Sequence, residues 1–161
     1  MKTNLSKRMA IIAILVILFG VINILFLLAQ GEHTVGGIWT EPEEAFAKWD
    51  ESILWFQIAL LAGRTVFGIV TNVFAMLFML NSINLMKCGE FFSKRNATIL
   101  WWAAPVYFLY GFCSDNMPLV YGGLHNAVLN TDSIFVPLLL IGIAMIYSTG
   151  VRLSEENRLT V

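Results

Sequence analysis

Residues 9–29 read "MAIIAILVILFGVINILFLLA", an apolar run that contains no charged side chain. A helix of roughly 20 residues crosses the hydrocarbon core of a bilayer, so this run is long enough to span a membrane. The apolar core of a cleaved signal peptide is shorter, about 7–15 residues, and a small-residue cleavage site follows it. The exit "LLAQGEH" offers no such site, so the run predicts an uncleaved membrane anchor.

Three more apolar runs follow along the chain, at residues 53–86, 97–113 and 133–151. Of the 161 residues, 58% are hydrophobic and 13% are charged, whereas a soluble domain averages about 45–50% apolar and about 25% charged residues. We therefore expect an all-α integral membrane protein, in which residues 1–161 form a single domain of four transmembrane helices.

Basic residues predict how these four helices are oriented. Cytoplasmic loops are enriched in lysine and arginine, and eight of the ten basic residues fall at one end of the expected bundle. These eight are Lys2, Lys7, Arg8, Lys87, Lys94, Arg95, Arg152 and Arg158. We expect both termini and the loop after residue 86 to be cytoplasmic, with the acidic segment 30–52 on the outer side.

The outer segment before the second apolar run has a helix-start signal of its own. Thr40 and Glu43 have the spacing of a capping box. Phe46, Trp49 and Ile53 follow at helical spacing, with charged residues between them. This pattern predicts a short amphipathic helix that lies on the outer interface and leads into the 53–86 helix.

The later part of the chain predicts two further features. Residues 114–132 are long for a loop and half apolar, so we expect them to fold back onto the bundle, and residues 130–133 are good N-cap residues for the last helix. Pro105 removes one backbone hydrogen bond and predicts a kink in the 97–113 helix.

The chain lacks the side chains that several membrane enzymes need. A disulfide oxidoreductase needs neighbouring thiols, but Cys88 and Cys113 are predicted on opposite sides of the membrane. A haem within the bundle needs ligands at membrane depth, but His33 and His125 fall in outer segments. A proton-coupled exporter needs an acidic relay, and the one carboxylate beside an apolar run is Asp132. We predict no catalytic residue, no cofactor and no enzymatic activity.

A metal site in the outer segments is an alternative for Glu32, His33, Asp115 and His125. The two histidines lie 92 positions apart and lack the spacing of a metal-binding motif. We predict ordinary polar contacts for these side chains, and no metal.

Arg64, within "ALLAGRTVFGIV", is the one charge inside an apolar run. An ionisable residue at membrane depth is a functional hypothesis by default. If the membrane-spanning part ends at Met86, Arg64 lies near the outer headgroups and its side chain can extend to them. If Arg64 lies deeper, it needs polar partners, and Asn23 and Asn72 are the candidates. We favour the first interpretation.

Two stretches at the cytoplasmic end, "GEFFSKRNATIL" at residues 89–100 and "GVRLSEENRLTV" at residues 150–161, carry a family resemblance. The positions concerned are Gly89, Phe92, Asn96, Leu100, Gly150, Leu153, Glu155, Glu156, Asn157, Leu159, Thr160 and Val161. With four helices and this length, the chain resembles the bacterial membrane family catalogued as domain of unknown function 2975. Trp101 and Trp102 stand where members carry further basic residues, so the role of those charges does not carry over.

The resemblance implies a multi-pass protein of the bacterial cytoplasmic (inner) membrane without established enzymatic activity. Genes of the family often lie beside genes for small helix-turn-helix regulators. We therefore expect a non-enzymatic membrane sensor or tether that regulates such a cytoplasmic partner and does not itself bind nucleic acid. The alternative is a small membrane transporter or channel, oligomeric or not, that uses the intramembrane polar residues Arg64 and Asn72.

The loop and the tail are predicted to form one docking surface, because both emerge from the same end of the bundle. Its residues are Gly89, Phe91, Phe92, Lys94, Arg95, Asn96, Glu155, Glu156 and Leu159. The basic pair of the loop can approach the glutamate pair of the tail, and Gly89 is expected to supply a turn conformation. Asn96 is expected to cap the third membrane helix. The two phenylalanines either dip into the membrane interface or, with Leu159, anchor a partner.

The predicted orientation can be tested by labelling single cysteines in intact cells. Glu43→Cys and Lys94→Cys, each in a background that lacks Cys88 and Cys113, should react from opposite sides of the membrane. An impermeant thiol reagent should therefore label the first variant and spare the second. Equal labelling of both variants would contradict the four-span orientation.

Overall fold

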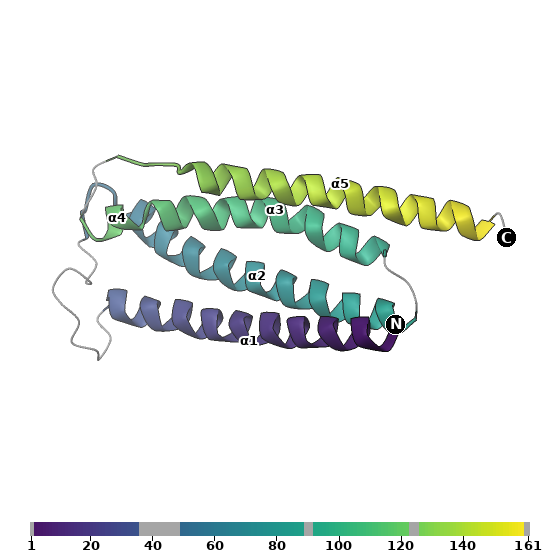
Figure 1. Cartoon of the computed structure of the whole chain (residues 1–161). Helices are drawn as coiled ribbons and strands as arrows, with labels where there is room; N and C mark the ends of the chain where they lie inside the picture. The colour runs from purple at the N-terminus through teal and green to yellow at the C-terminus, as the bar shows by residue number, and fades with distance from the viewer. Residues whose placement is uncertain (1, 36–48, 89–91, 123–125, 160–161) are drawn as a thin grey trace.

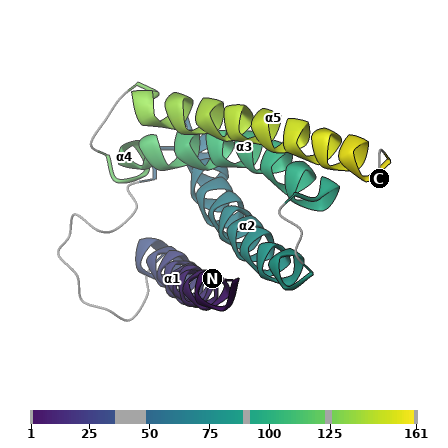
Figure 2. The same ribbon diagram turned by 45° about the vertical axis from the view of Figure 1, so that its right-hand side comes forward.

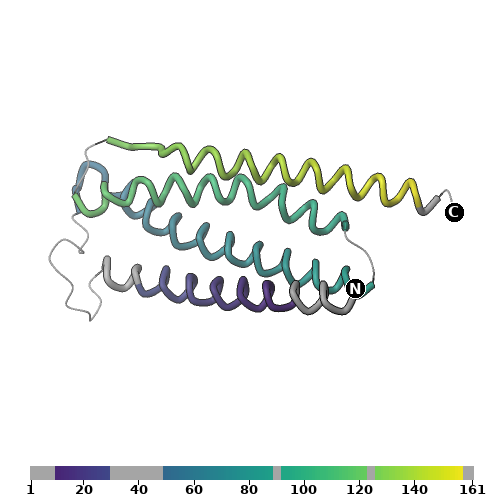
Figure 3. Tube along the Cα trace, in the orientation of Figure 1, coloured from purple at the N-terminus to yellow at the C-terminus, as the bar shows by residue number. Residues whose placement is uncertain are grey.

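The computed structural model describes residues 2–35, 49–88, 92–122 and 126–159, with side chains over 10–29, 49–88, 92–122 and 126–157 (Figure 3). Its described part is all-helical (Figure 1). The helices are α1 (Lys2–Val35), α2 (Leu54–Lys87), α3 (Lys94–Asp115), the short α4 (Met117–Val120) and α5 (Thr131–Leu159).

Four of these helices are long and apolar enough to cross a membrane, which confirms the four predicted spans. The candidate spans are Ala10–Ala29, Leu54–Lys87, Lys94–Val120 and Thr131–Asn157. The helix α2 has 34 residues, so it is roughly 50 Å long against a hydrocarbon core of about 30 Å. The N-terminus and the C-terminus lie at the same end of the bundle (Figure 1).

The four long helices pack in the order α1, α2, α3, α5, so α2 and α3 are the two inner helices. The helix α3 packs against α2 on one side and against α5 on the other, whereas α1 packs extensively against α2 alone among the described helices (Figure 2). The face of α1 that contacts α2 repeats every seven residues, because Ala13, Gly20 and Leu27 are buried and the residues between them are mostly exposed. Most of the surface of α1 is therefore left for lipid or for another helix.

Small residues allow the helices to approach one another closely. A Cβ atom at Gly63 of α2 would lie 2.7 Å from Sγ of Cys113 on α3, and a Cβ atom at Gly111 of α3 would lie 2.6 Å from Oγ of Ser133 on α5. Without a strong hydrophobic force between helices in lipid, such close contacts supply much of the packing energy. Ala144 of α5, in a small-residue pair with Ser148, is fully buried.

The segment after α3 folds back onto the bundle, as predicted for its described residues. The side chains of Met117, Leu119 and Val120 are buried, and they form one apolar cluster with Leu60 of α2 and Cys113 of α3. The chain then turns at Gly122, whose positive φ of 75° suits a residue without a Cβ atom.

Buried amides hold this folded segment in place. The side chain of Gln57, 1% exposed, donates to the backbone oxygen of Leu119 at 2.9 Å and accepts from the backbone N–H of Asp50 at 3.0 Å. Asn116 is fully buried; its amide donates to the oxygens of Phe112 and Val128 at 2.8 and 2.7 Å, and its oxygen accepts from the N–H of Val128 at 2.7 Å.

The start of α5 is tied to the end of α3 by Asp115. Its carboxylate accepts hydrogen bonds from the backbone and the side chain of Asn130 at 2.9 and 2.8 Å and from the Ser133 hydroxyl at 2.6 Å. A negative charge near a helix N-terminus is also favourable to the helix dipole. The polar cluster 130–133 therefore does mark the helix start, since α5 begins at Thr131.

The structure differs from the sequence predictions at several places. The helices α1 and α5 extend beyond their apolar runs, to Lys2–Val35 and Thr131–Leu159. Most of the predicted amphipathic outer helix, including Thr40, Glu43 and Phe46, lies outside the described residues. Its described end, residues 49–53, is a non-helical stretch and a turn. Pro105 lies in the interior of α3, which remains helical around it, and the kink there stays a prediction.

A hydrogen-bonded turn leads into α2 instead. One carboxylate oxygen of Asp50 accepts from the hydroxyl of Ser52 at 2.7 Å and from its backbone N–H at 2.9 Å. These two bonds hold the pKa of the Asp50 carboxyl below its usual value. The terminal position of the expected amphipathic helix, Ile53, is the residue that precedes α2.

The close contact between α3 and α5 can be tested by adding one methyl group. Gly111→Ala should lower the free energy of unfolding in detergent by about 1–3 kcal/mol, because the new Cβ atom overlaps Ser133 and overpacking has this range of cost. Gly142→Ala on α5 is the matched control, since a Cβ atom there meets no described atom within 4 Å. Equal effects of the two substitutions would contradict the assigned packing.

Candidate functional site

The candidate site lies at the end of the bundle that carries both termini, where α2 ends and α3 begins. Ser93 is the N-cap of α3, because its hydroxyl accepts from the backbone N–H of Asn96 at 3.1 Å. The prediction that Asn96 caps this helix is therefore wrong. Serine is among the preferred N-cap residues, and Asn96 instead lies in the first turn with its side chain directed into the bundle.

Asn96 is the centre of a buried polar network that joins three helices. Its amide donates to the hydroxyls of Ser82 on α2 and Tyr147 on α5, at 2.9 and 3.2 Å. Its oxygen accepts from the Asn81 amide at 2.6 Å, and Asn81 also donates to Ser93 at 3.1 Å. Both amide donors of Asn96 are satisfied, although the residue is 0% exposed. The network therefore fixes α2, α3 and α5 relative to one another at this end.

Aromatic packing covers the network. The ring of Tyr147 is in edge-to-face contact with Phe92, at a centroid distance of 5.0 Å, and with Phe78, at 5.9 Å. Gly150, one turn after Tyr147, makes room for Phe92, because a Cβ atom there would lie 2.7 Å from the phenylalanine ring. Phe92 nevertheless keeps 40% of its surface exposed, so part of the residue is available for contact.

An ion pair links the loop to α5. Nζ of Lys94 lies 3.0 Å from a carboxylate oxygen of Glu155, as the sequence predicted for the loop and the tail. Glu156 pairs within its own helix, with Arg152 at 3.6 Å, and no ion pair of Arg95 is found among the described residues. All of these side chains are largely exposed, so each pair contributes only about 0–1 kcal/mol.

A shallow groove of about 360 Å³ opens between α3 and α5 beside this ion pair. Its polar lining comes from Lys94, Thr98, Ser148, Arg152 and Glu155, and Trp101 forms part of its apolar wall. The helix α5 continues past the groove to Leu159, and residues 152–157 are all exposed. The tail is thus an exposed helical extension rather than a separate fringe.

The structure brings four of the nine predicted docking residues together, whereas Arg95 has no ion pair among the described residues and Glu156 pairs with Arg152. Phe92, Lys94, Asn96 and Glu155 meet at one end of the bundle through the contacts above. Gly89, Phe91 and the side chain of Leu159 lie outside the described residues. Asn81, Ser82 and Tyr147 were not among the predicted site residues. Asn81 and Ser82 are polar residues near the end of an apolar run, where a network at the end of a bundle can form.

Arg64 and Asn72 do not form the pair that the sequence analysis considered. Asn72 donates to the backbone oxygen of Gly68 at 2.8 Å, and its oxygen accepts from Asn23 of α1 at 3.4 Å. Nε of Arg64 is buried and has no hydrogen-bond partner among the described residues. The two asparagines are therefore partners of each other rather than of Arg64.

A metal centre is not found in the described part of the chain. No group of three histidine, cysteine, aspartate or glutamate side chains there has the geometry to hold an ion. Cys88 is exposed, Cys113 is buried, and both are free thiols. The side chains of Glu32, His33 and His125 lie outside the described residues, and Asp115 is engaged with α5.

Comparisons of the chain with protein-family models, with curated proteins and with solved structures found no match. The candidate site is therefore defined by its geometry: a buried amide network, an aromatic cover and a charged rim.

Removing the amide of Asn96 should weaken the bundle. Asn96→Ala deletes three side-chain hydrogen bonds, which at about 0.6 kcal/mol each in membrane proteins amounts to about 2 kcal/mol of unfolding free energy. Asn84→Ala is the control, because Asn84 is exposed on the same end of α2 and should cost less than about 0.5 kcal/mol. Unfolding in detergent measures both; a cost for Asn96→Ala no greater than the control would contradict the network's structural role.

Proposed function

We propose that the protein is a non-enzymatic sensor or tether of the bacterial cytoplasmic membrane that regulates a small helix-turn-helix transcription regulator. The observation that carries the proposal is the exposed extension of α5, which projects past the start of α3 (Figure 1). An exposed, charged helix end that is anchored to a neighbouring loop offers a binding surface. Exposed, charged side chains on a held helix end suit binding, which is the activity that this surface supports best.

A docking surface must keep its shape before the partner arrives. Chain ends fray unless contacts hold them, and two contacts hold the last part of α5 against the loop. Lys94 pairs with Glu155, and Phe92 packs against Gly150 and Tyr147. The exposed ion pair adds little stability, so its role is to orient the end of α5 against the loop, while the half-exposed ring of Phe92 supplies an apolar anchor.

The Asn96 network couples this surface to the membrane. Asn96 bonds to residues of α2 and α5 from its place in α3, so a change in how these helices pack alters the positions of Lys94 and Glu155 together. A signal that changes helix packing within the bilayer thus reaches the cytoplasmic surface through one buried side chain. The nature of the partner is supported by the family resemblance, and the cytoplasmic placement by the eight basic residues at this end.

A small transporter or channel is the alternative function. Nε of Arg64, which is buried and has no hydrogen-bond partner among the described residues, favours it, because ionisable residues within a membrane-spanning helix often mark ion or solute pathways. Flux of ions or solutes through liposomes that contain the purified protein distinguishes this alternative from a docking function.

The docking proposal can be tested by affinity capture in mild detergent. Glu156→Arg reverses a charge on the exposed end of α5; it removes the exposed Arg152–Glu156 pair, but it leaves the contacts of Lys94, Glu155 and the Asn96 network in place. It should weaken capture of the cytoplasmic regulator at least about fivefold, which corresponds to about 1 kcal/mol. The readout is the amount of regulator captured, identified as a DNA-binding protein by mass spectrometry.

The matched control is Glu51→Arg, which makes the same charge change on an exposed residue at the opposite end of the bundle. This variant should capture the regulator at the wild-type level. Equal capture by both variants, or loss of capture in both, would show that the exposed end of α5 is not the docking site.

A further inference from the structure

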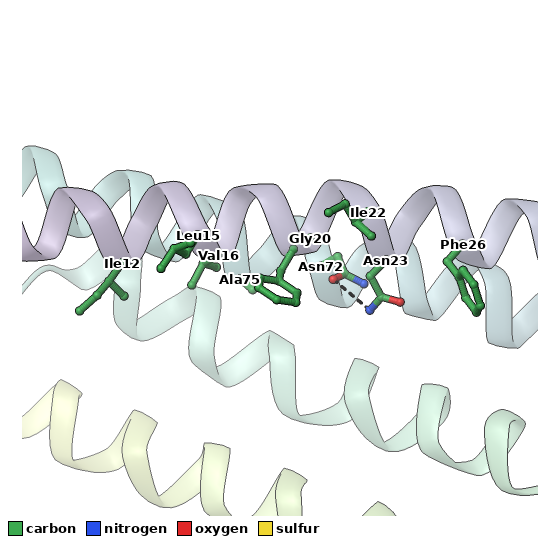
Figure 4. A pocket seen from close by; sticks show the side chains of 10 residues that line it. Ile12, Leu15, Val16, Gly20, Ile22, Asn23, Phe26, Asn72 and Ala75 are labelled. Atoms are coloured by element: carbon green, nitrogen blue, oxygen red, sulfur yellow. Dashed lines mark hydrogen bonds between the residues drawn. The ribbon is translucent and has the colours of Figure 1, made fainter.

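One face of α1, here called the seam, is not covered by another described helix. A groove of about 580 Å³ runs along its junction with α2 (Figure 4). Five of the α1 residues that line it, Ile12, Val16, Phe19, Asn23 and Phe26, are spaced alternately four and three residues apart. This alternation is the spacing of the core positions in a left-handed coiled coil. Ile12, Phe19 and Phe26 are 47%, 70% and 61% exposed, so the described helices leave the seam uncovered.

One of these core positions carries an amide. Asn23 lies within the candidate span Ala10–Ala29, between apolar residues of a helix that is long enough to cross the bilayer. Its side chain is exposed, and the one hydrogen bond that it makes among the described residues is the long one to Asn72, at 3.4 Å (Figure 4). Within the described part of the chain, one N–H and the oxygen of this amide have no partner, and lipid offers none.

We propose that this seam is the interface of a parallel homodimer, in which the two Asn23 side chains hydrogen-bond across a two-fold axis. Copies inserted with the same orientation are related by rotation about the membrane normal. Their α1 helices are then parallel, and the two Asn23 residues lie at the same depth. An asparagine amide is its own complement, because each N–H can donate to the oxygen of the other copy.

The same geometry leaves the intramolecular contact in place. The amide of Asn23 has two N–H groups, so one continues to donate to Asn72 while the other crosses the interface. A lipid chain in the groove cannot satisfy the amide. An asparagine at a single core position also favours one register and one oligomeric state, even where it reduces stability.

Paired cysteine variants test the interface in native membranes. In a background with Cys88→Ser and Cys113→Ala, Phe19→Cys and Phe26→Cys should form disulfide-linked dimers on mild oxidation. The controls are Val21→Cys and Leu28→Cys, which lie at similar depths but on the opposite side of α1 at 3.6 residues per turn. These two positions are also exposed, at 44% and 48%, so accessibility alone does not favour the seam.

The affinity of the dimer provides a second and independent readout. Asn23→Leu removes two reciprocal hydrogen bonds and should raise the dissociation constant in detergent roughly eightfold, at about threefold for each bond. Asn23→Gln, which keeps an amide, should weaken the dimer less. The proposal is overturned if seam cysteines cross-link no better than their opposite-face controls, if the cross-linked product contains a different protein, or if Asn23→Leu dimerises as tightly as the wild type.

Discussion

A polar group that leaves water for a membrane must find its hydrogen bonds inside the protein, and this constraint governs both ends of the bundle. Asn96 and Asn116 are fully buried, and Gln57 is 1% exposed. Each is bonded to more than one segment of the chain. An unsatisfied polar group in a low-dielectric interior is costly. Alternative packings of α2, α3 and α5 that strand these amides are therefore disfavoured, and the amides select one arrangement from many that apolar packing alone would allow.

In the described part of the chain, α1 takes no part in these networks of buried amides. It meets α2 through Ala13, Gly20 and Leu27 and through one long amide contact between Asn23 and Asn72. Close packing at Gly20 brings α1 near Met76, but no fully buried amide joins the two helices in the described residues. The rest of the bundle uses its buried amides for its own cohesion, whereas α1 retains donor and acceptor capacity at membrane depth. Polar groups inside a membrane protein need hydrogen-bond partners. On the side of α2 that faces α3 and α5 the buried amides have them, whereas on the side that faces α1 the amide of Asn23 has one long hydrogen bond among the described residues.

Composition and hydrophobic run length were sufficient to predict the four spans, since these depend on local sequence alone. The Lys94–Glu155 pair was also predictable, because helix order brings the loop and the tail to one end. The role of Asn96 could not be predicted from the sequence. "SKRN" contains two good N-cap residues, and the choice between Ser93 and Asn96 depends on Ser82 and Tyr147, which are distant in sequence. Likewise, Asn23 and Asn72 were both noticed, but their mutual pairing depends on the packing of α1 against α2, which no local pattern specifies.

The two proposed surfaces lie on different helices, yet symmetry connects them. A two-fold axis along the membrane normal places the charged ends of both copies on the same side of the bilayer, because α5 has the same direction in each copy. Helix-turn-helix regulators commonly act as two-fold symmetric dimers. A membrane dimer built on α1 would therefore offer two equivalent docking ends to a partner with two equivalent sites. Each docking contact would then raise the effective concentration of the other, so a weak, exposed surface at the end of α5 would suffice to hold such a partner if both ends were engaged.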